Sequence, residues 1–109
     1  MATTYKVLGQ SNPAATTSTS LYTVPASTQA IVSTLTVCNQ ASTDATFRVS
    51  VSVNGAALSA KEYIAYDATV RGNGFLTFTL GMSLGAADVI RVYASSTSLS
   101  FSAFGTEIA

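Results

Sequence analysis

The residues best suited to chemistry are two carboxylates, Glu62 and Asp67, which flank the tyrosines Tyr63 and Tyr66. Many glycosidases need only two carboxylic acids, one as the acid and the other as a nucleophile or base. Acids beside tyrosines on a strand are more commonly ion-paired or solvated. We therefore do not expect Glu62 and Asp67 to form a catalytic pair.

The sequence contains no histidine and only one cysteine, Cys38. The usual general base, the commonest metal ligand and a Ser-His-Asp triad are therefore missing. A zinc site of the usual kind is excluded as well. Asp44, Asp67 and Asp88 do not have the spacing of a calcium-binding loop. We expect no enzyme activity, no cofactor and no metal, and we expect Cys38 to be a small buried hydrophobic side chain.

The segment 61–67 is the most distinctive patch, because it combines two tyrosines with three charged residues. Tyrosines in such a setting anchor protein interfaces, with the ring buried and the hydroxyl at the rim. Its candidate interface residues are Lys61, Glu62, Tyr63 and Tyr66. Because residues i and i+3 of a strand point to opposite faces, we expect one of these tyrosines to face inward and the other to make a contact.

Charge is scarce: the 109 residues include five basic and five acidic ones, and the net charge is zero. An ordinary soluble domain is about a quarter charged, and a chain without net charge tends to self-associate. The basic residues form no cluster, which argues against nucleic acid. No apolar stretch approaches the roughly 20 residues that cross a bilayer, so no membrane contact is expected. The first residues lack the layout of a signal peptide, which predicts synthesis in a cytosol.

Alternation of apolar and polar residues predicts strands along most of the chain, and the clearest runs from 46 to 53. Asn54-Gly55 follows it, a dipeptide that tolerates positive φ in a tight hairpin turn. About seven or eight short strands of this kind predict an antiparallel β-sandwich or jelly-roll-like domain over 21–109. A single helical turn is expected around 59–62. The predicted core is made of Leu35, Val37, Phe47, Val49, Val51, Leu76, Phe78, Ile90, Val92, Leu99 and Phe101.

Residues 1–20 are predicted to form an N-terminal strand and a flexible arm. Tyr5, Val7 and Leu8 form a short apolar strand, and the residues from 9 to 20 are nearly all small and polar. An apolar strand on a tether can add to the sheet of a neighbouring subunit, so these three residues are candidate interface residues. The alternative is that the strand folds back as an edge of its own sandwich.

Several segments resemble small structural proteins of tailed bacteriophages, particularly cyanophage-like viruses. The likeness extends over almost the whole chain. It is carried by Tyr5-Lys6-Val7-Leu8-Gly9-Gln10, Leu21-Tyr22-Thr23-Val24-Pro25, Val32-Ser33-Thr34-Leu35-Thr36-Val37-Cys38-Asn39, Lys61-Glu62-Tyr63-Ile64-Ala65-Tyr66-Asp67, Ala87-Asp88-Val89-Ile90-Arg91-Val92-Tyr93-Ala94 and Leu99-Ser100-Phe101-Ser102-Ala103-Phe104-Gly105.

The resemblance implies a non-enzymatic virion protein on the particle exterior, made in the cytoplasm of a bacterial host. A capsid cement or decoration protein that stabilises neighbouring subunits is the first expectation, and a neck, tail or tail-fibre-associated component is the alternative. A carbohydrate- or host-surface-binding β module, using Tyr63, Tyr66 and Tyr93, is a third. The expected partners are further copies of the chain, with a trimer as the expected order, and the major capsid or tail proteins.

Overall fold

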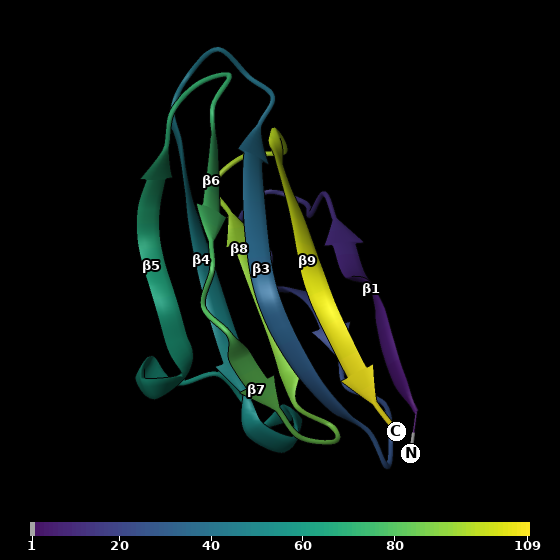
Figure 1. The fold of residues 1–109 in the computed structure, drawn as a ribbon. Coiled ribbons are helices and arrows are strands. Elements are labelled where there is room, and N and C mark those ends of the chain that lie inside the picture. The colour runs from purple at the N-terminus through teal and green to yellow at the C-terminus, as the bar shows by residue number, and fades with distance from the viewer. Residues whose placement is uncertain (1) are drawn as a thin grey trace.

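The computed structural model describes residues 2–109 and shows two antiparallel sheets packed face to face (Figure 1). This confirms the predicted β-sandwich. Within these residues there are nine strands, because the segment after Phe75 forms two strands separated at Gly81 instead of one. The elements are β1 (Thr3–Ser11), β2 (Thr19–Thr23), β3 (Gln29–Asn39), β4 (Ala45–Ser52), the short 3₁₀ turns η1 (Val53–Gly55) and η2 (Ala60–Glu62), β5 (Tyr63–Val70), β6 (Phe75–Phe78), β7 (Met82–Leu84), β8 (Val89–Ala94) and β9 (Leu99–Ile108).

The five-stranded sheet has the order β1-β9-β3-β6, and β7 also pairs with β3. The four-stranded sheet has the order β2-β8-β4-β5. The first and last strands of the chain are therefore neighbours, and Figure 1 shows both termini at one end of the sandwich. The backbone N–H of Ala2 donates to the carbonyl of Ala109 at 2.7 Å, and the N–H of Ala109 donates back at 2.9 Å.

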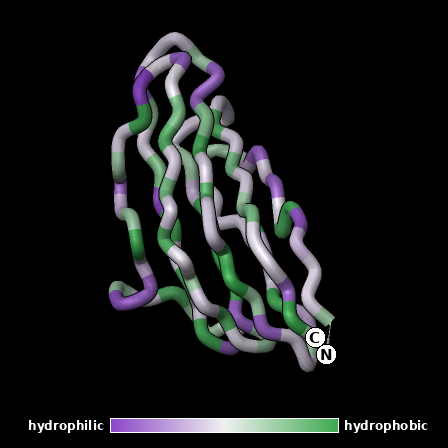
Figure 2. Tube along the Cα trace, in the orientation of Figure 1, coloured by the Kyte–Doolittle hydropathy of each residue, from purple (hydrophilic) through white to green (hydrophobic). Residues whose placement is uncertain are grey.

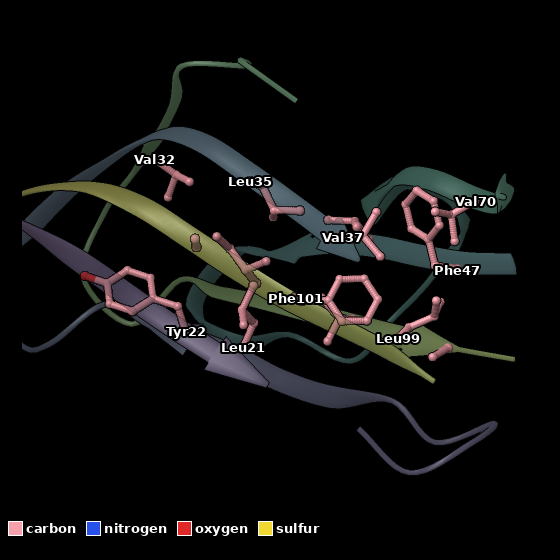
Figure 3. Close-up of a cluster of buried hydrophobic side chains, with 14 of the residues drawn as sticks. Leu21, Tyr22, Val32, Leu35, Val37, Phe47, Val70, Leu99 and Phe101 are labelled. Atoms are coloured by element: carbon pink, nitrogen blue, oxygen red, sulfur yellow. The ribbon is translucent and has the colours of Figure 1, made fainter. Parts of the chain in front are cut away.

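Aromatic rings join the two sheets within the core, and Figure 3 shows Phe47 and Phe101 on the same side as Val70 and Leu99. The ring centroid of Phe47 in β4 lies 6.1 Å from that of Phe101 in β9 and 5.8 Å from that of Phe78 in β6. Most of the predicted core residues are fully buried, and Val51, Leu76 and Phe78 are half-buried against them. The buried apolar residues that periodicity did not single out include Leu21, Tyr22, Val24, Val32, Leu84 and Val70.

Bulges change which face of a strand is buried. In β3 the register shifts between Val32 and Thr34, so inward positions are even before Ser33 and odd from Leu35 onward. Cys38 consequently points outward and is exposed. The expectation of a buried cysteine is therefore wrong: it rested on the usual burial of lone cysteines, whereas Cys38 follows the inward Val37 and so faces the other side of β3.

The N-terminal strand lies at the edge of its own sandwich, and this is the alternative that the sequence left open. β1 pairs with β9 of the same chain along its whole length, and Leu8 packs against the core. The segment behind it is docked as well: Asn12 Nδ2 donates to the carbonyls of Thr97 and Leu99 at 2.9 and 2.6 Å, and Pro13 is buried. The arm expected for residues 1–20 is thus corrected, because its polar groups find partners on the domain itself.

The connection between β4 and β5 is longer than a tight hairpin. Asn54 and Gly55 have positive φ, at 55° and 68°, as predicted, but they form η1 within a loop that continues to Glu62. The predicted turn at 59–62 is present as η2. It has a capping box in which the Ser59 N–H donates to Glu62 Oε1 at 2.6 Å.

Replacing Phe101 by alanine should lower the free energy of unfolding by about 3–5 kcal/mol, because Phe101 is fully buried against Phe47. Ser100→Ala, one residue away on the outer side, should change it by no more than about 0.5 kcal/mol. Urea denaturation followed by circular dichroism measures both values. Equal losses in the two variants would contradict the assigned inward face of β9.

Gly9→Ala should destabilise the domain because β1 crosses very close to β2 at this residue. A Cβ at Gly9 would sit 2.1 Å from the carbonyl oxygen of Leu21, a backbone atom that cannot move aside without shifting a strand. Gly85→Ala is the matched control, since its Cβ would meet only the Asp88 carboxylate at 3.8 Å. We expect Gly9→Ala to lower the melting temperature by at least about 5 °C and the control to leave it nearly unchanged.

Candidate interaction surfaces

Arg48 is at the centre of a cluster on the outer face of the four-stranded sheet. It lies opposite Tyr93 in the β4–β8 register, and its guanidinium carbon is 4.3 Å from the Tyr93 ring centroid and 4.1 Å from that of Tyr66. Its Nε donates to Asp67 Oδ1 at 2.7 Å, and its Nη2 donates to Asp67 Oδ2 at 3.3 Å. The hydrogen bond to Asp67 raises the pKa of Arg48. The guanidinium is therefore fixed between two rings and one carboxylate.

Tyr63 and Tyr66 lie on the same face of β5 and touch each other. Their ring centroids are 4.9 Å apart and their planes are nearly perpendicular, at 89°. The prediction that they point to opposite faces is wrong, because the register of β5 shifts on both sides of Ala65 and Asp67 has a positive φ of 52°. We call Arg48, Tyr63, Tyr66, Asp67 and Tyr93 the Tyr–Arg patch.

The two carboxylates of the 61–67 segment have separate partners. Glu62 Oε1 accepts hydrogen bonds from the Ser59 N–H and hydroxyl, whereas Asp67 binds Arg48. Each carboxylate has a structural task, and no geometry links them as an acid and a base. Lys61 is exposed beside them, and a surface hollow is lined by Ser59, Ala60, Tyr63 and Tyr66.

The Tyr–Arg patch suits a protein contact better than a sugar. Tyr66 is 59% exposed, yet one side of its ring faces Arg48. The Tyr63 ring also contacts it in a T-shaped arrangement. The side of the ring that faces Arg48 is therefore not free to stack on a sugar. Tyrosine and arginine held in place before binding lose little conformational entropy on contact, which is the usual property of interface hot spots.

The outer face of the five-stranded sheet has a different character. The buried core residues show which side of each strand faces inward, and the strand register then identifies the residues that face outward. Within residues 2–109 none of the outward positions holds a charged residue. We call this surface the neutral face; its outward residues are Thr3, Tyr5, Val7 and Gln10 of β1, Ser100, Ser102, Phe104, Thr106 and Ile108 of β9, Gln29, Ile31, Ser33, Thr34, Thr36 and Cys38 of β3, Phe75 and Thr77 of β6, and Ser83 of β7.

Apolar side chains gather on the half of the neutral face nearest the termini. The exposed fractions of Tyr5, Val7 and Ile31 are 82%, 49% and 42%, and Phe104 and Ile108 are half-buried between them. Figure 2 colours inward and outward residues alike, and along β3 and β9 most of the tube is white or green. The two candidate surfaces thus lie on opposite sheets, so Tyr5 and Val7 are not brought together with Tyr63 and Tyr66.

The two charged residues of β1 and β9 point away from the neutral face. Lys6 Nζ lies 2.9 Å from Glu107 Oε1, and the Tyr22 hydroxyl donates to Glu107 Oε2 at 2.6 Å. The Tyr22 hydrogen bond, followed by that of Lys6, lowers the pKa of Glu107, while burial and Glu107 raise the pKa of Tyr22. This trio links β1, β9 and β2 beneath the neutral face.

Comparison with known protein families finds no matching family model, and comparison with curated proteins finds no match. In the part of the chain that the structure describes, no three His, Cys, Asp or Glu side chains come close enough together to hold a metal ion. No helix of residues 2–109 is long and apolar enough to cross a membrane.

The lowered pKa of Glu107 predicts a pH-dependent contribution to stability. A carboxylate with a depressed folded-state pKa stabilises the fold above its unfolded pKa, and that contribution is lost as the pH falls through the folded value. Glu107→Gln should therefore melt a few degrees lower than the wild type at pH 7, and the gap should narrow as the pH falls below the unfolded carboxyl pKa of about 4.3. Melting curves from pH 7 to 3 measure this. A gap independent of pH would assign the effect to packing.

Proposed function

We propose that this chain is a non-enzymatic structural protein of a tailed-phage virion, most simply a capsid cement or decoration protein on the particle exterior. The observation that carries the proposal is the separation of charge between the two outer faces: the neutral face has none, and the Tyr–Arg patch on the other sheet has a clamped ion pair. The resemblance of the sequence to small phage structural proteins supplies the virion context.

The neutral face supports a role in assembly. Soluble monomers rarely expose a large apolar patch, and their surfaces usually contain charged residues. Here Tyr5, Val7, Ile31 and Phe75 are all exposed on one face, and none of the other outward residues of that face is charged. A side of the molecule built in this way is stabilised when another protein covers it.

The Tyr–Arg patch supports a second contact, to a shell protein. Arg48 is fixed in place by Tyr66, Tyr93 and Asp67, so binding would not have to order a long flexible side chain. A module with two unlike surfaces can bridge two neighbours, as a cement protein must. Neck, tail or fibre proteins could offer the same kind of partner surface, and they are outcomes of the test below.

Electron microscopy of intact phage particles that carry a tag at Ala109 tests the proposal. Ala109 is exposed at the end of the sandwich where both termini lie, so a tag there is accessible, and it is not part of the Tyr–Arg patch. Regularly spaced extra density over the capsid is expected. Density at the neck or tail would replace the decoration role by the alternative, and particles without the tag would contradict a virion protein.

Tyr66→Ser should reduce binding of the purified chain to particles that lack it by at least about tenfold, because it removes a ring that contacts both Arg48 and Tyr63. Thr69→Ser, an exposed substitution on the same strand, is the control. Co-sedimentation with particles measures both variants. Undiminished binding of Tyr66→Ser would remove the patch from the contact, and binding of either chain to a glycan array instead would favour the carbohydrate-binding alternative.

A further inference from the structure

The neutral face contains both a protruding ring and a hollow. The Tyr5 side chain, 82% exposed, stands on edge strand β1. On the other side of β9 a hollow of about 360 Å³ is lined by residues that include Ile31, Ser83 and Ile108. A cavity of about 150 Å³ is enough to hold a benzene molecule, so this hollow has room for a phenol ring.

The register places these two features symmetrically about β9. Tyr5 lies opposite Thr106, and Thr106 lies opposite Ile31, which in turn lies opposite Ser83. The four residues form one row across the sheet, with Tyr5 one strand to one side of β9 and Ile31 one strand to the other. A half-turn about an axis along β9 therefore brings the Tyr5 of one copy over the Ile31 and Ser83 of another.

We propose that two copies of this chain pack neutral face to neutral face about a two-fold axis along β9, with each Tyr5 ring seated in the hollow of the other copy. Such an interface is isologous, because the same residues meet in both directions. This dimer adds a contact between copies to the proposed assembly role, and it can be measured on the isolated chain. An absence of dimers would therefore be a different result from an absence of the chain in phage particles.

Charge and register both favour a second copy as the occupant. A charged partner surface would leave its ions without counter-charges against the neutral face, whereas a second neutral face brings none. A half-turn about β9 overlays β1, β9 and β3 of one copy on β3, β9 and β1 of the other, and β6 lies outside the contact. The two longest dimensions of the molecule, 45 and 27 Å, bound the whole face to an area on the order of 1,000 Å², and a stable interface buries about 800 Å² on each partner, so nearly all of the overlaid surface must take part.

Sedimentation equilibrium of the full chain tests the proposal. The wild type should have twice the 11.2 kDa monomer mass at micromolar concentration. Tyr5→Asp and Ile31→Asp should each weaken the dimer at least about 100-fold, because each places a charge in the contact. Tyr5→Phe should leave it intact, and so should Thr69→Asp on the opposite sheet. Circular dichroism identifies any variant that fails to fold, and Tyr5→Ser then takes its place.

Cross-linking tests the axis itself. In a Cys38→Ser background, Thr106→Cys places a thiol on β9 at the two-fold axis, so a short bifunctional maleimide should join two copies in high yield. Thr46→Cys, on the outer side of the four-stranded sheet, should give little cross-linked dimer. A monomeric or trimeric wild type, a dimer that survives both charged variants, or equal cross-linking at the two positions would overturn the proposal.

Discussion

Burial of Phe47 between Phe101 and Phe78 is the interaction on which the rest of the structure depends. It joins the two sheets, and by doing so it decides which side of β4, β6 and β9 faces inward. Since residues of a strand alternate, the side chains of these strands that do not face the core point to the outer side of their sheet. The neutral face and the Tyr–Arg patch are therefore direct consequences of how the core is packed.

The alternation of apolar and polar residues along the sequence predicts many of the strands and their inward faces. Phe47 and Phe101 each lie in a run in which apolar and polar residues alternate cleanly, so their strands and inward faces could be predicted. Bulges could not, because nothing in the residues around Ser33 or Ala65 marks an extra residue in the ladder. The register shifts on both sides of Ala65 reversed the expectation for the pair Tyr63 and Tyr66.

The pairing of strands that are distant in the sequence was the second feature that could not be predicted. Arg48 was visible as an outward residue of a strand, but its position beside Tyr93 depends on the β4–β8 register, which no local pattern encodes. The same is true of the row that links Tyr5 to Ile31 through β9, a strand almost a hundred residues further along the chain. Local periodicity identified the faces, and topology then decided which residues share one.

The contact between the two ends of the chain has a consequence for how such a module can be used. Ala2 and Ala109 are hydrogen-bonded to each other, so the polypeptide enters and leaves the domain at nearly one point. A domain of this kind can be inserted into a surface loop of a larger protein without forcing that loop apart, or its ends can be joined and new ones opened at an exposed turn. The same sandwich is thus suited to exist as a separate chain or as an appendage of another.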